Sequence, residues 1–251
     1  MNKAMKAAVV AASIAMLFGS ANMTEAAQSK AANKSSQAAA KTSAADKKAF
    51  EAAKAELSKK LAPGDLYILY VRDKALNGGE EFMNYMNMFQ FKTYEDYLNQ
   101  AAKLKGPTLT KPEGLPDGYK FVKGNIQPPF EKYLTQYQKE VKAEAAAKGK
   151  SAYYKKFDWK EPGEINLAFA NGKDNLQMQV SYSVSKDKGT SGYSYRTADE
   201  FDSELAKKHP EWVRNKLSWS DEDHVYNITT NPGNPLTKED LIKLAKTAVK
   251  K

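Results

Sequence analysis

The sequence of 251 residues contains no cysteine, only two histidines and only three arginines. The absence of cysteine excludes disulfide bonds, thiol catalysis, cysteine-ligated zinc and a lipid-modified N-terminal cysteine. The fold must therefore depend on burial of apolar surface, and about 200 residues are enough to form such a core. An exported bacterial protein is the class that a chain without cysteine fits best.

Motifs of the common enzyme classes are also missing. The sequence contains no G-x-S-x-G, no H-E-x-x-H, no phosphate-binding glycine loop and no EF-hand loop. His209 stands beside Pro210 after a predicted helix, and Ser185 with Lys188 matches S-x-x-K without the companion motifs. We predict a non-enzymatic protein with no catalytic, cofactor-binding or metal-ligating residue and no cofactor. A hydrolase with two distant carboxylates in a polar cleft stays open as a third alternative.

No hydrophobic run is long enough to span a bilayer. Residues 7–18 are apolar, two lysines precede them, and small residues follow as far as Ala26 and Ala27. This pattern predicts a signal peptide over residues 1–27 that is cleaved near Ala26 or Ala27. We therefore expect no transmembrane segment and a secreted, extracellular protein that associates with the cell wall.

Residues 28–45 are rich in alanine, serine, lysine and glutamine and contain no large apolar side chain. Such a segment cannot bury enough surface to fold, so we predict a flexible linker. A single domain is expected over residues 46–251.

The formal net charge is +9, and removal of residues 1–27 takes away two lysines and one glutamate, which leaves +8. Lysine supplies nearly all of the positive charge, whereas readout of bases favours arginine, so a nucleic-acid partner is not expected. A lysine-rich exported surface suits an anionic cell-wall polymer, such as a teichoic acid, or anionic headgroups. The alternative is a solvated surface without such a partner.

Hydrophobic periodicity predicts an α+β fold, in which helices pack on one face of an antiparallel β-sheet and the last helix is amphipathic. The clearest hairpin is residues 164–185, with its turn at Asn171-Gly172. The C-terminal helix begins at Thr237, with Asp240 in position to complete a capping box, and its buried stripe is expected to run from Leu241 to Ala248. Further helices are predicted at 46–61, 93–104, 130–148 and 197–209, and further strands at 65–72, 119–124, 152–159, 217–219 and 226–230.

Two segments have more than one interpretation. Asp221, Glu222, Asp223 and His224 form the sequence SDEDH, which predicts a hairpin turn more readily than a metal site, because consecutive residues on a tight turn point in different directions. The segment from Phe82 to Phe91 is dense in methionine and aromatic residues. It is typical of a core, and lining of a pocket for an apolar ligand is the alternative.

Four segments resemble, in this order, the domain-of-unknown-function family 4367 over about residues 88–249: GLPDGYKFVKG (114–124), INLAFANGKDNLQMQVS (165–181), LSWSDEDHVYNIT (217–229) and LTKEDLIKLAKTA (236–248). The lysine-rich stretch at 130–150 and the helix at 197–209 depart from the family pattern. The resemblance implies an exported or membrane-tethered domain of Gram-positive bacteria, with SDEDH at the tip of a hairpin, and it implies no catalytic residues.

We therefore expect a secreted, non-enzymatic binding domain of the Gram-positive cell envelope, whose partner is an anionic cell-wall polymer or an envelope protein. The second hypothesis is a carrier or sensor for an apolar ligand, related to sigma-regulator sensor domains. A cavity lined by the segment from Phe82 to Phe91 together with Tyr67, Leu69 and Tyr119 would support it.

Overall fold

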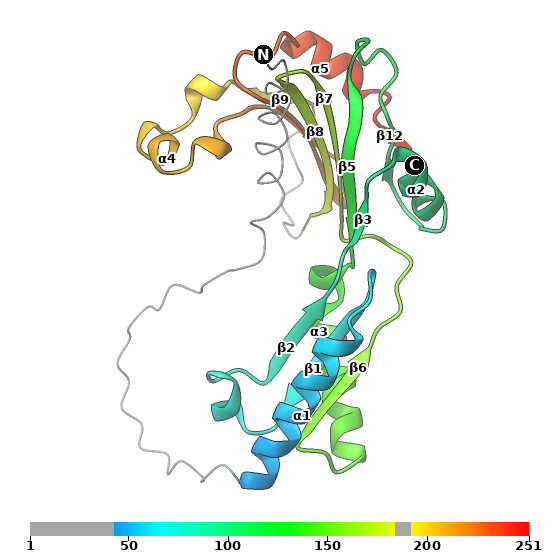
Figure 1. Cartoon of the computed structure of the whole chain (residues 1–251), viewed down its shortest axis with the longest axis vertical. Helices are drawn as coiled ribbons and strands as arrows, with labels where there is room; N and C mark the ends of the chain where they lie inside the picture. Colours follow the sequence, from blue (N-terminus) through cyan, green and yellow to red (C-terminus); the bar gives the residue numbers. More distant parts are fainter. Residues whose placement is uncertain (1–42, 184–191, 251) are drawn as a thin grey trace, which may run out of the picture. The chain divides into compact units, whose positions relative to one another are not determined.

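The computed structural model describes residues 43–183 and 192–250, so the predicted signal peptide and all but the last three residues of the predicted linker lie outside it (Figure 1). Every strand pair in this part of the chain is antiparallel, and helices pack on the sheets. The predicted α+β class is confirmed. No helix in residues 43–183 and 192–250 is long and apolar enough to cross a membrane.

A three-stranded sheet has the order β2-β1-β6, with β2 at Phe82–Met86, β1 at Leu66–Val71 and β6 at Ala152–Lys156. Helix α1 (Ala44–Lys60) packs on one face of β1, and helix α3 (Phe130–Ala147) packs on the other. The central strand β1 is therefore buried along its whole length. Coverage of both faces explains why its sequence, LYILYV, is apolar without alternation.

A seven-stranded sheet contains most of the remaining strands, in the order β3-β5-β7-β8-β11-β10-β9. Its strands are β3 Phe89–Phe91, β5 Lys120–Gln127, β7 Glu164–Asn171, β8 Asp174–Tyr182, β9 Ser194–Arg196, β10 Asn215–Ser220 and β11 His224–Thr230. The predicted hairpins β7–β8 and β10–β11 are both present. Apolar side chains on the core face alternate with small or polar ones on the other face, and Leu167, Met178 and Ile228 are among the fully buried side chains.

Two helices and a two-stranded ribbon cover one face of this large sheet (Figure 1). They are α2 (Tyr94–Ala101), α5 (Lys238–Ala245), and β4 (Thr108–Leu109) paired with β12 (Val249–Lys250). In the part of the chain that the structure describes, no helix forms an apolar cluster with the opposite face, although Asn125, Ala168 and Asn227 on that face are buried. The large sheet thus has one apolar face in the core and one polar face.

Helix ends follow the capping rules. Thr93 accepts a hydrogen bond from the backbone N–H of Asp96 at the start of α2. Thr237 and Asp240 form the complete capping box of α5 that the sequence predicts. Leu236 and Leu241 are both buried beside this cap.

Two segments differ from the prediction. The single helix expected at 197–209 is a 3₁₀ turn (Ala198–Glu200) followed by the short α4 (Ser203–Lys208), because Asp202 caps a new helix after Phe201 adopts an extended backbone. The C-terminal helix ends at Ala245, because the chain turns there into β12.

Helix α1 also refines a boundary, since it begins at Ala44, within the predicted linker. The loop expected at 186–192 lies outside the described residues except for its last position.

Candidate functional site

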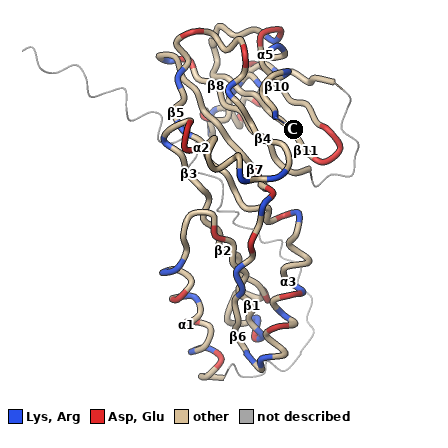
Figure 2. The backbone as a smooth tube through the Cα atoms, turned by 90° about the vertical axis from the view of Figure 1, so that its right-hand side faces the viewer, with Lys and Arg blue, Asp and Glu red and all other residues tan. Residues whose placement is uncertain are grey.

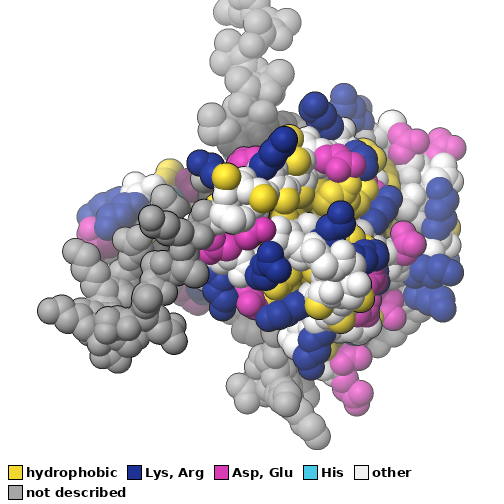
Figure 3. Space-filling view, turned by 90° about the horizontal axis from the view of Figure 1, so that it is seen from below, with side chains coloured by type: hydrophobic (Ala, Val, Ile, Leu, Met, Phe, Trp, Pro, Cys, Tyr) yellow, Lys and Arg dark blue, Asp and Glu magenta, His cyan; other side chains and the backbone are white. Residues whose placement is uncertain are grey.

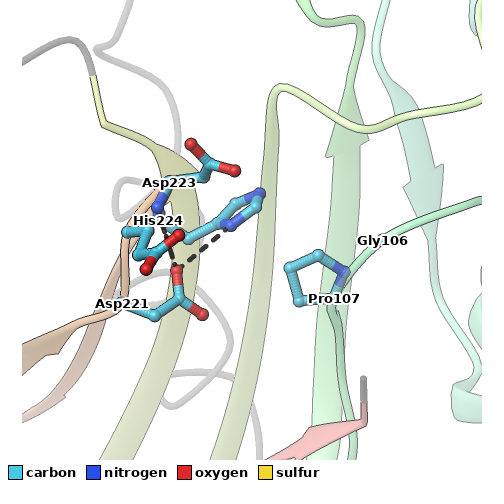
Figure 4. Close-up of a pocket in the computed structure, with 6 residues that line it drawn as sticks. Gly106, Pro107, Asp221, Asp223 and His224 are labelled. Carbon is cyan, nitrogen blue, oxygen red and sulfur yellow. Dashed lines mark hydrogen bonds and ion pairs between the residues drawn. The ribbon is translucent and has the colours of Figure 1, made fainter.

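The SDEDH segment forms the tip of the β10–β11 hairpin, as the sequence predicts. The Oδ1 atom of Asp221 accepts hydrogen bonds from the backbone N–H groups of His224 at 2.9 Å and Asp223 at 3.3 Å. Its Oδ2 atom accepts a hydrogen bond from the hydroxyl of Tyr226 at 2.8 Å. Figure 4 shows the imidazole of His224 turned toward the same carboxylate, with an Nδ1–Oδ1 distance of 3.4 Å. Asp221 therefore closes the turn.

The environment of Asp221 favours its ionised form. Burial alone would raise the pKa of this carboxyl group. The hydrogen bonds from Tyr226, His224 and Asp223 outweigh burial and hold the pKa below its usual range. Burial and the neighbouring carboxylate in turn raise the pKa of the Tyr226 hydroxyl.

A hollow of about 490 Å³, open to solvent, lies between the hairpin tip and Gly106-Pro107 (Figure 4). Glu222 and Asp223 are exposed at its rim. In residues 43–183 and 192–250, no group of three or more histidine and acidic side chains is placed to hold a metal ion. The tip is best described as a hydrogen-bonded turn beside a shallow hollow.

The other residues considered for catalysis do not form a constellation. The ring of His209 stacks on the exposed Trp212 with a centroid distance of 3.9 Å. Its Nδ1 atom lies 3.4 Å from Oε1 of Glu211. Ser185 and Lys188 lie outside the described residues.

The segment from Phe82 to Phe91 contributes to three separate apolar clusters. Phe82 and Met86 pack under α3, whereas Met83 and Tyr85 pack under α1. Strand β3 joins the core of the seven-stranded sheet. Tyr67 and Leu69 lie in the α1 cluster, and Tyr119 lies in the core of the large sheet. These side chains therefore do not line one common cavity.

Basic side chains around the three-stranded sheet are paired with acids. The Nζ atom of Lys155 lies 2.6 Å from Glu144 and 3.1 Å from Glu140. Lys156 lies 2.6 Å from Asp65. Figure 2 shows basic and acidic residues alternating along α3, and Figure 3 shows both signs interspersed on the surface seen from below. No field of a single sign is visible in that view.

The pairing has a clear effect on one carboxyl group. Hydrogen bonds from Lys155, Tyr153 and Lys148 lower the pKa of Glu144 to about 2. Charges in this region therefore neutralise one another locally.

The polar face of the seven-stranded sheet carries basic residues of a different kind. Lys216 in β10 and Arg196 in β9 are direct cross-strand partners on this face, because their neighbours Leu217 and Tyr195 point into the core. Arg214 lies on the same face, since its Nη1 atom donates to Oδ1 of Asn175 at 3.3 Å. We call Arg196, Arg214 and Lys216 the cation cluster. It contains two of the three arginines of the chain.

No ion pair joins the cation cluster to an acid in the described part of the chain. The guanidinium of Arg196 instead lies over the ring of Phe201, 5.4 Å from its centroid. Burial lowers the pKa of Lys216, and the charge of Arg196 lowers it further. Burial also lowers the pKa of Arg214, while Glu211 opposes that shift. Like charges directly opposite each other in a sheet destabilise the fold, which makes this arrangement unusual for a merely solvated surface.

The sequence alone did not identify the cation cluster. The alternation of Lys216 with Leu217 could have placed the lysine on a polar face. Its pairing with Arg196 depends on the order and register of β9 and β10, and residues 197–214, which include α4, separate these strands.

Comparisons of the chain with protein-family models, with curated proteins and with solved structures gave no match. The resemblance to domain-of-unknown-function family 4367 therefore stays a prediction.

Proposed function

We propose that the protein is an exported, non-enzymatic binding domain that attaches to an anionic polymer of a Gram-positive cell envelope. The observation that carries this proposal is the cross-strand pair of Lys216 and Arg196, two like charges without an acidic partner among the described residues. An anion bound between them would remove the repulsion and form charge-assisted hydrogen bonds.

The contrast between the two sheets supports this proposal. Around the three-stranded sheet, lysines face glutamates or aspartates at hydrogen-bonding distances. On the large sheet the cation cluster remains available to an external anion. The net positive charge adds a diffuse attraction that brings a polyanion to the surface.

The test is sedimentation of the purified protein with cell-wall sacculi, prepared with and without teichoic acid, at low and at high ionic strength. We expect the protein to sediment with intact sacculi at low salt and to remain in solution when teichoic acid has been removed. Binding should weaken strongly in high salt, because ions screen exposed charges beyond about 3 Å at 1 M. Failure to bind intact sacculi at low salt would refute the proposal.

A further inference from the structure

The polar face of the seven-stranded sheet carries a continuous row of amide and hydroxyl side chains. In each strand, the register places one such residue directly opposite one in the neighbouring strand. In the order of the strands, the row runs through Gln90, Asn125, Asn166, Gln179, Asn227 and Ser218. It ends at Ser194 in β9. We call these residues the amide row.

The composition of the row is not what a sheet favours. Asparagine is depleted in strands, where β-branched and aromatic residues are preferred. Three asparagines nevertheless occupy this row, and the same strands place Leu167, Met178 and Ile228 on the core face. Local propensity therefore does not explain the amides, which points to a role for their side chains.

Hydrogen bonds link the amides along the row. Asn166 Nδ2 donates to Asn125 Oδ1 at 3.1 Å. Asn227 Nδ2 donates to Gln179 Oε1 at 3.0 Å, and its own Oδ1 accepts from Ser218 Oγ at 2.8 Å. These bonds fix the amide groups in one orientation and rigidify the surface.

Two of the amides retain unused hydrogen-bonding capacity at the surface. Asn125 and Asn227 are buried and hold the row together, whereas Asn166 and Gln179 are half-buried. Among the described residues, Oδ1 of Asn166 and Nε2 of Gln179 have no hydrogen-bond partner. An amide supplies two donor hydrogens and a carbonyl acceptor, so these atoms present both donors and acceptors to a ligand. Hydroxyl groups, which donate and accept, match this alternation.

The next row on the same face is cationic. It runs from Lys123 in β5 through Gln177 and Thr229 to Lys216 and Arg196. The row on the other side contains Glu164, whose carboxylate accepts hydrogen bonds from the amides of Gln127 and Asn166. Positive charge thus flanks the amide row on one side only.

We propose that this face binds a poly(polyol phosphate) chain, with hydroxyl groups on the amide row and phosphates on the cation cluster. This inference rests on the proposed function and names the surface and the polymer class. Seven strands at the usual separation span roughly 29 Å, enough for several repeats of such a polymer. Arginine forks and lysine are suited to phosphate oxygens, and the amides distinguish a hydroxylated chain from a bare polyanion.

The chemistry of the face disfavours nucleic acid. Proteins that bind single strands stack bases on aromatic side chains. Within the described strands, the two rows contain no aromatic residue, because the aromatic positions of β5, β7, β9 and β11 point into the core. An acyclic polyol phosphate needs hydrogen bonds and cations but no stacking surface.

The test measures binding of the full chain to soluble poly(glycerol phosphate) by titration calorimetry at low salt. Dextran, inorganic polyphosphate and a single-stranded RNA oligonucleotide serve as comparison probes. We expect poly(glycerol phosphate) to bind more tightly than each of them.

Two variants address the surface. Combined Lys216→Gln and Arg196→Gln substitution should weaken binding of poly(glycerol phosphate) by about tenfold or more, because two charge-assisted contacts are lost. Gln179→Glu keeps the oxygen that accepts from Asn227 and replaces the free amide nitrogen with a charged oxygen. It should weaken binding by about threefold to tenfold.

Matched controls make the same changes in charge elsewhere. Lys48→Gln with Lys59→Gln removes two exposed positive charges from α1, and Asn99→Asp adds one negative charge on an exposed position of α2. Both controls should change affinity by less than about twofold, apart from the small diffuse effect of net charge. Thermal unfolding monitored by circular dichroism checks that every variant is folded.

The outcomes separate the two proposals. Wild-type binding that the sheet-face variants and the α1 control weaken equally would overturn the assignment of the surface and leave the proposed function intact. RNA or polyphosphate binding as tight as that of poly(glycerol phosphate) would overturn the assignment of polymer class. No binding of poly(glycerol phosphate) at low salt, together with no binding of sacculi, would overturn both.

Discussion

The two sheets of the protein differ in how many of their faces helices cover. The three-stranded sheet has α1 on one face and α3 on the other, and its central strand is apolar throughout. The seven-stranded sheet has α2 and α5 on one face, and its strands alternate between buried apolar and polar residues. The large sheet therefore has a polar face that the core does not use, and this is the face on which we propose recognition.

The two regions also differ in how their charges are arranged. Lys155 and Lys156 are paired with acids around the three-stranded sheet. Lys216 and Arg196 face each other on the large sheet. The net charge of the chain is therefore a poor guide to a binding surface. Basic side chains that have no acidic partner nearby are a better guide.

The largest expected effect concerns adjacent positions within one strand. In β1, Ile68→Ala and Leu69→Ala should each lower the free energy of unfolding by about 2–5 kcal/mol, because both side chains are fully buried, on opposite faces. In β11, Ile228→Ala should cost about as much, while Thr229→Ala should change stability by no more than about 0.5 kcal/mol. Urea unfolding of the four variants measures these differences.

The expected difference between Ile228→Ala and Thr229→Ala requires that the polar face of the large sheet is not packed against another segment in solution. A cost for Thr229→Ala equal to that of Ile228→Ala would mean that this face is packed against something. The proposed binding surface would then be wrong.

A smaller effect is expected at the hairpin tip. Asp221→Ala should lower the free energy of unfolding by about 1.5–3 kcal/mol, because it removes a charged acceptor from Tyr226 and from two backbone N–H groups. Asp221→Asn preserves the shape of the side chain and removes only the charge. Its cost should be smaller than that of the alanine variant.

The pH dependence distinguishes a hydrogen-bonded turn from a solvated acidic loop. The pKa of Asp221 is lower in the folded chain than in the unfolded one. Its stabilising contribution is therefore complete above about pH 4 and is lost as the pH falls through the folded pKa. Wild type should lose more stability than Asp221→Asn between pH 5 and pH 2, as a rough working range. Parallel pH profiles for the two proteins would contradict the role of the carboxylate.

The sequence was most informative where local chemistry determines structure. Alternation of Ile165, Leu167 and Phe169 around Asn171-Gly172 predicted the β7–β8 hairpin, because a turn of that type fixes the register of its strands. Thr237 and Asp240 predicted the start of α5 for a similar reason, since their hydrogen bonds are local. SDEDH was correctly assigned to a turn.

Features that depend on distant segments were not predictable in this way. Whether the segment from Phe82 to Phe91 forms one element could not be read from its periodicity, and it forms strands of two different sheets. The amide row requires the register of seven strands at once, and no single strand signals it. Asp202 could have indicated the break in the helix expected at 197–209, because aspartate is a preferred N-cap.

The smallest predicted effect is also the most direct test of the contrast in charge pairing. Lys216→Gln should raise the free energy of unfolding by about 0.2–1 kcal/mol at low ionic strength, because it removes repulsion with Arg196 directly across the strand pair. Lys155→Gln should have the opposite sign, since Lys155 lies within 3.1 Å of both Glu140 and Glu144. Guanidinium chloride would screen both effects, so urea unfolding at low and at high sodium chloride is the appropriate measurement.

Loss of stability in Lys216→Gln would mean that the lysine supports the fold. A gain in stability coupled to weaker binding of polyanions is the trade-off typical of a residue retained for function at a cost to the fold.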